Sequence, residues 1–226
     1  MTENIPYIDE YHDDMEYPLP GYAAIIMKQT DVRAGDVLLG YAAITADEEQ
    51  AKPLGYSHAA IALSNQLVLE ASTSGVSIIK INDLLDEYEH LAVLRNRDHW
   101  DSERLKGLEN FAQKQKGKPF NLHGMQRVPD RKEKHGAEML KQLQGYFDGS
   151  YTPPSPIQSS YFCSQLVACA FIDANLIGES GSIVFSPKVM SPSDIGIDKL
   201  FGFFVGYVPR SENYEVPMDD YFRHFL

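Results

Sequence analysis

Short apolar runs separated by turn-forming residues dominate the first half of the chain. Three such runs follow one another at 57–63, 67–71 and 76–81. The segments between them, 64–66 and 72–75, consist of Ser, Asn, Gln, Thr and Gly, a composition that favours turns. Runs of this length joined by such short connections predict neighbouring antiparallel strands, and therefore a meander.

Other segments have the aliphatic, β-branched or aromatic content of buried strands. They lie at 37–39, 91–94 and 201–208. Apolar spacings of three and four predict helices from about 101 to 117, about 137 to 147 and, with the clearest apolar face, about 160 to 175. Residues 118–136 are rich in charge, Gly and Pro, and we expect a surface excursion there. The pattern predicts an α+β fold with a central antiparallel sheet of about five or six strands.

Composition and charge narrow the class of protein. The chain has 226 residues, of which 43% are apolar, which is enough for one substantial core. Its formal net charge of -12 would repel nucleic acid and anionic membranes. The first residues lack the basic and apolar regions of a signal peptide, and no stretch is long and apolar enough to span a bilayer. We expect a soluble protein without a stable membrane anchor or nucleic-acid partner, either cytoplasmic or exported without a cleaved signal.

The two cysteines, Cys163 and Cys169, are too few for a disulfide framework or a thiolate zinc site. On one helix they would lie roughly 240° apart, so they cannot easily pair. We interpret Cys169, which is mid-helix among apolar residues, as a small buried hydrophobe. Cys163 lies in the first turn of the predicted helix, where free backbone amides and the helix dipole favour a thiolate. Cys163 is therefore a candidate nucleophile.

A thiolate nucleophile needs a base, and of the seven histidines only His58 opens a predicted central strand. His58 shares its strand face with Ala60 and Ala62, whose small side chains leave room for a closely packed helix. That helix could be the one that carries Cys163. A core histidine bonded to the backbone is the alternative, and the pattern alone does not separate the two.

The group that orients the imidazole is expected on the neighbouring strand, where Glu70 is the only ionisable residue. Hairpin parity decides whether it reaches His58. A two-residue turn at Asn65-Gln66 places Glu70 on the opposite face, whereas a three-residue loop at 64–66 places it on the same face as His58. A solvent-facing Glu70 is the alternative, and Ser72 is then the second candidate for the orienting role.

Several motifs, taken in order, resemble a known family. They lie at 35–39 (GDVLL), 57–63 (SHAAIAL) running to 68–71 (VLEA), 117–120 (GKPF), 161–167 (YFCSQLV) and 191–194 (SPSD). With the histidine strand before the cysteine helix, the chain resembles the circularly permuted branch of NlpC-type papain-like amidohydrolases, of which YiiX-like cysteine peptidases are members. Lecithin:retinol acyltransferase-like proteins, which move acyl groups through a thioester, share this permuted order.

The resemblance implies a permuted papain-like fold, with the nucleophile helix packed on one face of the sheet. It implies that Cys163 is the nucleophile, that His58 is general base and then acid, and that Glu70 orients His58. The acyltransferase-like branch often has a second histidine in place of the carboxylate, so Glu70 favours the amidohydrolase side. The backbone amide of Cys163 is the expected oxyanion donor, and Tyr41 or Tyr56 could add a hydroxyl.

The resemblance covers about residues 35–194 and leaves both ends of the chain outside it. We expect an acidic N-terminal arm and lead-in at 1–34, a catalytic domain at 35–208 with a charged insertion at about 121–156, and a C-terminal tail at 209–226. The implied activity is that of a cysteine peptidase or amidase that needs no metal or cofactor. A peptidoglycan-type peptide or another small amide is the expected substrate. An exported antibacterial effector, with a secretion machinery or immunity protein as partner, is one setting that fits. A lipid acyltransferase or lipase and an inactive binding module are the alternatives.

Overall fold

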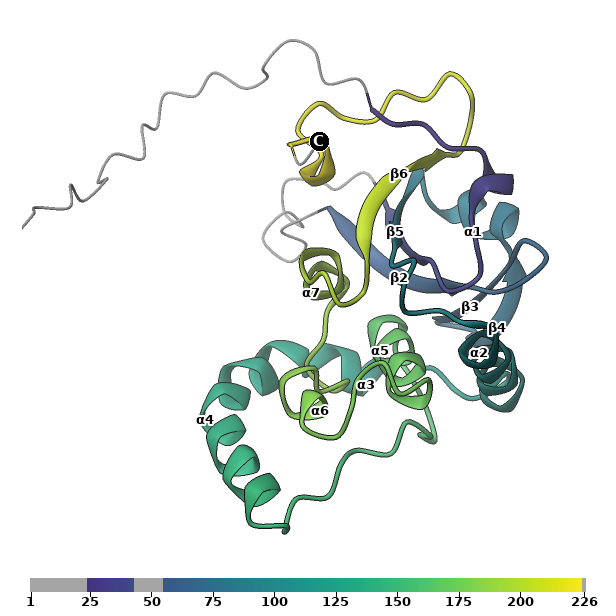
Figure 1. Cartoon of the computed structure of the whole chain (residues 1–226). Coiled ribbons are helices and arrows are strands. Elements are labelled where there is room, and N and C mark those ends of the chain that lie inside the picture. Colours follow the sequence, from purple (N-terminus) through teal and green to yellow (C-terminus); the bar gives the residue numbers. More distant parts are fainter. Residues whose placement is uncertain (1–23, 43–54, 225–226) are drawn as a thin grey trace, which may run out of the picture.

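The structure, a computed structural model, describes residues 24–42 and 55–224 (Figure 1). Most of the predicted N-terminal arm lies outside these residues. Within them, six strands form one antiparallel sheet in the order β4-β3-β2-β1-β5-β6. The α+β fold with a central antiparallel sheet is confirmed.

The strands are β1 (Val37–Tyr41), β2 (Tyr56–Ala62), β3 (Leu67–Ser72), β4 (Gly75–Lys80), β5 (His90–Arg95) and β6 (Phe203–Pro209). The helices are α1 (Ile81–Glu87), α2 (Ser102–Gln115), α3 (Leu122–Gln126), α4 (Val128–Phe147), α5 (Cys163–Asp173), α6 (Gly181–Val184) and α7 (Pro192–Ile197). All six predicted strands are present, with small shifts at their ends. The helices predicted near 101–117 and 160–175 are α2 and α5.

The surface excursion predicted at 118–136 is wrong for most of that segment. α4 runs without interruption from Val128 to Phe147 instead of beginning near 137. Pro129 lies in its first turn, where a missing amide and a fixed φ start a helix rather than break it. The charged residues that follow are good helix formers and most are exposed. Charge therefore marked a solvated helix, not a loop.

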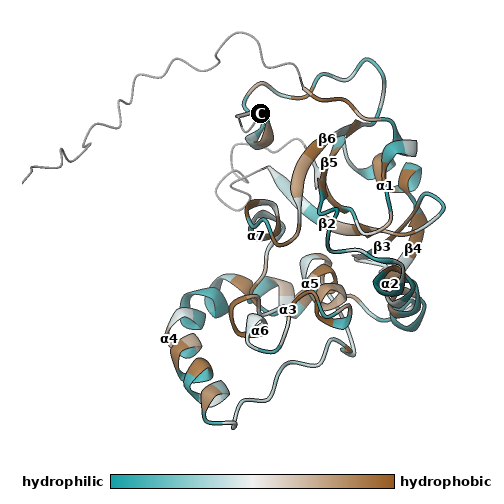
Figure 2. Cartoon of the chain, in the orientation of Figure 1, coloured by the Kyte–Doolittle hydropathy of each residue, from teal (hydrophilic) through white to brown (hydrophobic). Residues whose placement is uncertain are grey.

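Helices cover both faces of the sheet, with α1 on one side and α5 on the other (Figure 1). Apolar side chains from both layers are buried, and β5 and β6 are largely brown in Figure 2, whereas α2 is mainly teal. Ala59 and Ile61 of β2 pack in the same cluster as Leu166 of α5. Ala60 and Ala62 pack in the other cluster, with α1. The expectation that the Cys163 helix packs on the alanine face is wrong.

The β2–β3 hairpin combines a short turn with a bulge. Asn65 and Gln66 have left-handed φ values of 59° and 60°, and the Leu67 N–H donates to the Ser64 carbonyl at 3.3 Å. The Leu63 N–H donates to the Leu67 carbonyl at 2.8 Å. Leu67 therefore lies opposite two residues, which shifts the register by one.

The shifted register determines which side chains share a face. Ala62 pairs with Val68, which places Val68 and Glu70 on the face of Ala62 and His58. This is the register of the odd-length connection. A turn without the bulge would have moved Glu70 to the opposite face.

Candidate active site

Cys163 is the first residue of α5, and its side chain is buried. Phe162 before it is extended, and its N–H donates to Gln165 Oε1 at 3.3 Å. The Ser164 hydroxyl donates to the Met190 carbonyl at 2.8 Å. These two bonds fix the first turn of the helix and hold the sulfur where unpaired amides lie.

The GKPF motif at 117–120 forms backbone hydrogen bonds with the residues that precede Cys163. The Tyr161 N–H donates to the Pro119 carbonyl at 3.1 Å, and the Asn121 N–H donates to the Tyr161 carbonyl at 2.8 Å. On the other side, the Gly117 N–H donates to the Val76 carbonyl at 2.8 Å. The motif therefore connects β4 to the start of α5.

His58 and Glu70 form a buried pair across β2 and β3. His58 Nε2 lies 3.0 Å from Glu70 Oε2, and the side chains are only 6% and 4% exposed. The second carboxylate oxygen, Oε1, accepts a hydrogen bond from the hydroxyl of Ser77 at 3.1 Å. Ser77 is the cross-strand partner of Glu70 on β4. The carboxylate is thus held from both sides with one oxygen toward the imidazole.

The imidazole of His58 and the thiol of Cys163 lie close enough that each shifts the pKa of the other. Since Nε2 faces Glu70, Nδ1 is the nitrogen available to the sulfur. β2 and β3 are paired at Ile61–Leu69 and Ala62–Val68, and this pairing ends before it reaches His58. The backbone amide of Ala59 also acts on the thiol and lowers its pKa. Cys163 and His58 therefore come together beside the main chain of β2. The rest of α5 packs on the face of the sheet opposite to that of the His58 side chain.

Electrostatic contacts shift both reacting groups toward their charged forms. Burial raises the pKa of the Cys163 thiol, but the hydrogen bond and charge of His58 and the amides of Ala59 and Ser164 together lower it below its ordinary value. Burial lowers the pKa of His58, but its bonds to Cys163 and Glu70 raise it to about 10. Both shifts favour a thiolate beside an imidazolium at neutral pH.

Tyr88, which follows α1, also contacts His58 and was not among the predicted site residues. Its ring stacks on the imidazole of His58, with centroids 5.3 Å apart and an interplanar angle of 15°. Gly40 of β1 pairs with His58, and a Cβ at Gly40 would lie 2.8 Å from the Tyr88 ring. A glycine inside a buried strand often marks a place where another group approaches the backbone closely. Gly40 was therefore the one feature of the sequence that could have indicated the position of Tyr88.

The other predicted site residues make different contacts. The Tyr56 hydroxyl donates to Asp220 at 2.8 Å and lies 3.0 Å from His90 Nε2. Tyr41 stacks on His90 with centroids 4.5 Å apart, and the Ser72 hydroxyl lies 2.8 Å from that of Ser74. None of these contacts involves Cys163, so we do not assign Tyr41, Tyr56 or Ser72 a part in the mechanism.

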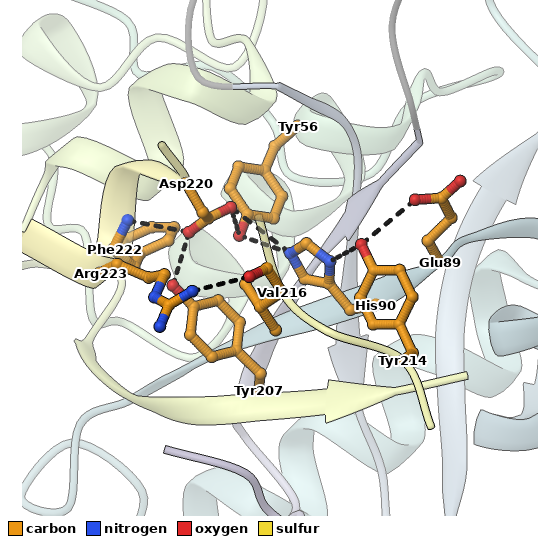
Figure 3. A network of polar contacts seen from close by, with 9 residues as sticks. All are labelled: Tyr56, Glu89, His90, Tyr207, Tyr214, Val216, Asp220, Phe222 and Arg223. Atoms are coloured by element: carbon orange, nitrogen blue, oxygen red, sulfur yellow. Dashed lines mark hydrogen bonds and ion pairs between the residues drawn. The ribbon is translucent and has the colours of Figure 1, made fainter. Parts of the chain in front are cut away.

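Asp220 is the centre of the network that contains Tyr56 (Figure 3). Its Oδ1 accepts hydrogen bonds from the Tyr207 hydroxyl at 2.5 Å and from the Phe222 N–H at 3.0 Å. His90 lies 3.5 Å from Oδ2, and both side chains are fully buried. This network fastens the segment after β6, which includes much of the predicted C-terminal tail, against the sheet.

Two absences hold for the described part of the chain. Among residues 24–42 and 55–224, no group of three or more His, Cys, Asp or Glu side chains is arranged to hold a metal ion. In the same ranges, no helix combines the length and the apolar character that crossing a bilayer requires.

The fold and the Cys163–His58–Glu70 arrangement are those expected of a papain-like thiol hydrolase with permuted order. Residues 31–133 match the model of a family described as permuted papain-like amidase enzyme, YaeF/YiiX. The match confirms the resemblance to permuted papain-like amidases and the class of enzyme, a cysteine amidase or peptidase. The matched residues include His58 and Glu70 but end before Cys163. The relation to NlpC-type and lecithin:retinol acyltransferase-like proteins is not tested by this match and stays a prediction.

One solved structure is similar to part of the chain, that of the metalloprotein yiiX from Escherichia coli O157:H7. The similarity covers 63% of this chain and 66% of that chain, with 17% sequence identity and a TM-score of 0.42. We draw nothing about the site from a similarity this distant. No curated protein matches the chain.

Proposed function

We propose that the chain cleaves an amide bond through a thioester formed on Cys163. The thiolate attacks the carbonyl carbon, and His58 in its protonated form donates a proton to the leaving amine. Neutral His58 then takes a proton from water as the water attacks the thioester, which releases the acid and regenerates the thiolate beside the imidazolium. Glu70 orients the imidazole throughout, and the backbone amide of Cys163 is the proposed donor to the oxyanion.

One observation carries this proposal: His58 contacts Cys163 and Glu70 at the same time, inside a buried site. A core histidine bonded to the backbone would not need both a thiol and a carboxylate. An inactive binding module on this fold would have no reason to lower the pKa of the Cys163 thiol.

For the substrate we propose a peptidoglycan-type peptide or another small amide. The carboxylate of Glu70, in place of a second histidine, supports the amidase side of the resemblance. The acidic net charge of -12 disfavours work at an anionic lipid surface. Export as an antibacterial effector, with its secretion machinery or immunity protein, rests on the sequence resemblance alone.

Parallel assays on muropeptides and phospholipids test the proposal. The unmodified chain should release products from the amide substrate, and Cys163→Ala should release none. Cys169→Ala is the matched control, because burial raises the pKa of that thiol to about 12 and leaves it unreactive. Products from lipid alone would contradict the amidase assignment. Full activity of folded Cys163→Ala protein would contradict the nucleophile.

A further inference from the structure

A cavity of about 550 Å³ lies apart from the Cys163 site. Its walls come from α4, from the loop at 151–154 and from residues 182–189 around α6. In Figure 1, α4 extends away from the sheet with α6 beside it. The lining includes neither Cys163 nor His58, so the cavity is not the reaction site described above.

The charge of this cavity is opposite to that of the chain. Arg131, Lys134 and Lys188 line it, against a single carboxylate, Glu138. Within residues 24–42 and 55–224, the ammonium groups of Lys134 and Lys188 have no hydrogen-bond or ion-pair partner. Three cations at one hollow of a chain with a net charge of -12 indicate a local site for an anion.

Other side chains that line the cavity can also donate hydrogen bonds. They include His135, Tyr151 and Ser182. Together with Arg131, Lys134 and Lys188, they can surround a group that has several acceptor oxygens.

The walls of the cavity are joined to each other and to the core. The hydroxyl of Tyr151 lies 2.9 Å from that of Ser182, across two of the walls. Lys132 of α4 forms an ion pair with Asp194 of α7. Val189 lines the cavity, and the next residue, Met190, accepts the hydrogen bond from Ser164. The site is therefore held in place before a ligand arrives, which lowers the cost of binding.

We propose that this cavity binds a small molecule through a phosphate or carboxylate group. Both groups offer several charged acceptor oxygens, which suits two ammonium groups and a guanidinium. The proposal does not depend on the hydrolase reaction, because it concerns binding at residues outside the Cys163 site.

Titrating the ¹⁵N-labelled chain with inorganic phosphate and, separately, with succinate tests this at constant ionic strength. At least one of the two should give saturable shifts of backbone amides in α4, 151–154 and 182–189. The ligand that saturates identifies the group, phosphate or carboxylate. The double variant Lys134→Gln/Lys188→Gln should raise the dissociation constant about tenfold or more, as loss of charge-assisted bonds requires.

The control variant is Lys106→Gln/Lys114→Gln, which removes the same charge from exposed positions of α2. It should leave the dissociation constant within about twofold of the unmodified chain, because distant exposed charges are screened by salt. Absence of saturation with both ligands would overturn the proposal. An equal loss of affinity in the two double variants would also overturn it, since binding would then follow net charge.

Discussion

The ring of Tyr88 lies nearly parallel to the imidazole of His58, at 15° and 5.3 Å between centroids. Burial first, and then the charges around Cys163, Glu87 and Glu70, raise the pKa of Tyr88, so its ring stays neutral. A neutral aromatic face stabilises a cation placed over it. Tyr88 therefore favours the protonated form of His58 and also fixes the plane in which that ring faces Glu70.

Replacing Tyr88 separates the ring from its hydroxyl. Tyr88→Phe keeps the stacking face, and its kcat should stay within about threefold of the unmodified enzyme. Tyr88→Leu removes that face, so kcat should fall about tenfold or more with little change in KM, because the imidazole is no longer held in position. Amide hydrolysis measured against pH, with thermal unfolding as the check on folding, separates these effects. Equal kcat values for the two variants would remove the positioning role.

The pKa shifts at the site predict how alkylation depends on pH. An ordinary thiol has a pKa near about 8.5. The pKa of Cys163 is lowered, so the midpoint of iodoacetamide labelling against pH, in a Cys169→Ala background, should lie below that of an ordinary thiol. His58→Ala removes the largest contributions that lower the pKa and leaves burial, which raises it, opposed only by the amides of Ala59 and Ser164. Its labelling curve should therefore move to higher pH than that of the unmodified site.

In the proposed mechanism, amide hydrolysis has a second limit, because the leaving amine takes the proton of His58. The pKa of His58 is raised to about 10, so the imidazolium persists through neutral pH and is lost as the pH rises through about 10. The rate should therefore be bell-shaped. Labelling of the unmodified site that begins only above about pH 8.5 would contradict the thiolate–imidazolium pair.

Glu70→Gln keeps the shape of the side chain but removes its charge. The carboxylate of Glu70, facing Nε2 of His58, is one of the groups that raise the pKa of His58, so this variant should lose activity at lower pH than the unmodified enzyme. We expect kcat to fall about 10- to 100-fold. Ser77→Ala removes one hydrogen bond to the same carboxylate and should cost less than about tenfold. An unchanged pH profile in Glu70→Gln would show that the carboxylate does not act through His58.

Local periodicity could predict the strands and the shared face of His58 and Glu70, because a strand repeats every two residues and a hairpin allows only two parities. The sequence could not show how that parity arises, since the bulge at Leu63 and Ser64 depends on the geometry of the whole turn. The sheet face predicted for the Cys163 helix was wrong for a related reason. Small side chains such as Ala60 and Ala62 show that something packs closely, and here it is α1.

Contacts between segments far apart in the sequence could not be predicted from local sequence patterns. The Tyr56–Asp220 hydrogen bond joins residues 164 positions apart, and neither residue has a distinctive neighbourhood in the sequence. Tyr88 reaches His58 only because β1 lies between β2 and β5 in the sheet. A single chain sequence contains no signal for such pairs, apart from the glycine at position 40, which leaves the space.

The buried carboxylate of Asp220 should stabilise the fold at neutral pH. Burial raises its pKa, but hydrogen bonds from His90, Tyr207 and Tyr56 lower it below the ordinary value. Asp220→Asn should therefore reduce the free energy of unfolding by about 2–4 kcal/mol, because buried donors lose a charged acceptor. Asp219→Asn, at the exposed neighbouring position, should change it by less than about 0.5 kcal/mol.

The sign of the pH dependence distinguishes this role from simple packing. A carboxylate with a lowered pKa adds stability above its unfolded pKa of about 3.9, and that contribution is lost as the pH falls toward the folded value. Urea unfolding at several pH values should show the largest difference between the unmodified chain and Asp220→Asn near neutral pH. The difference should shrink below about pH 4. A difference that stays constant down to about pH 3 would mean that the carboxylate acts through its shape and not through its charge.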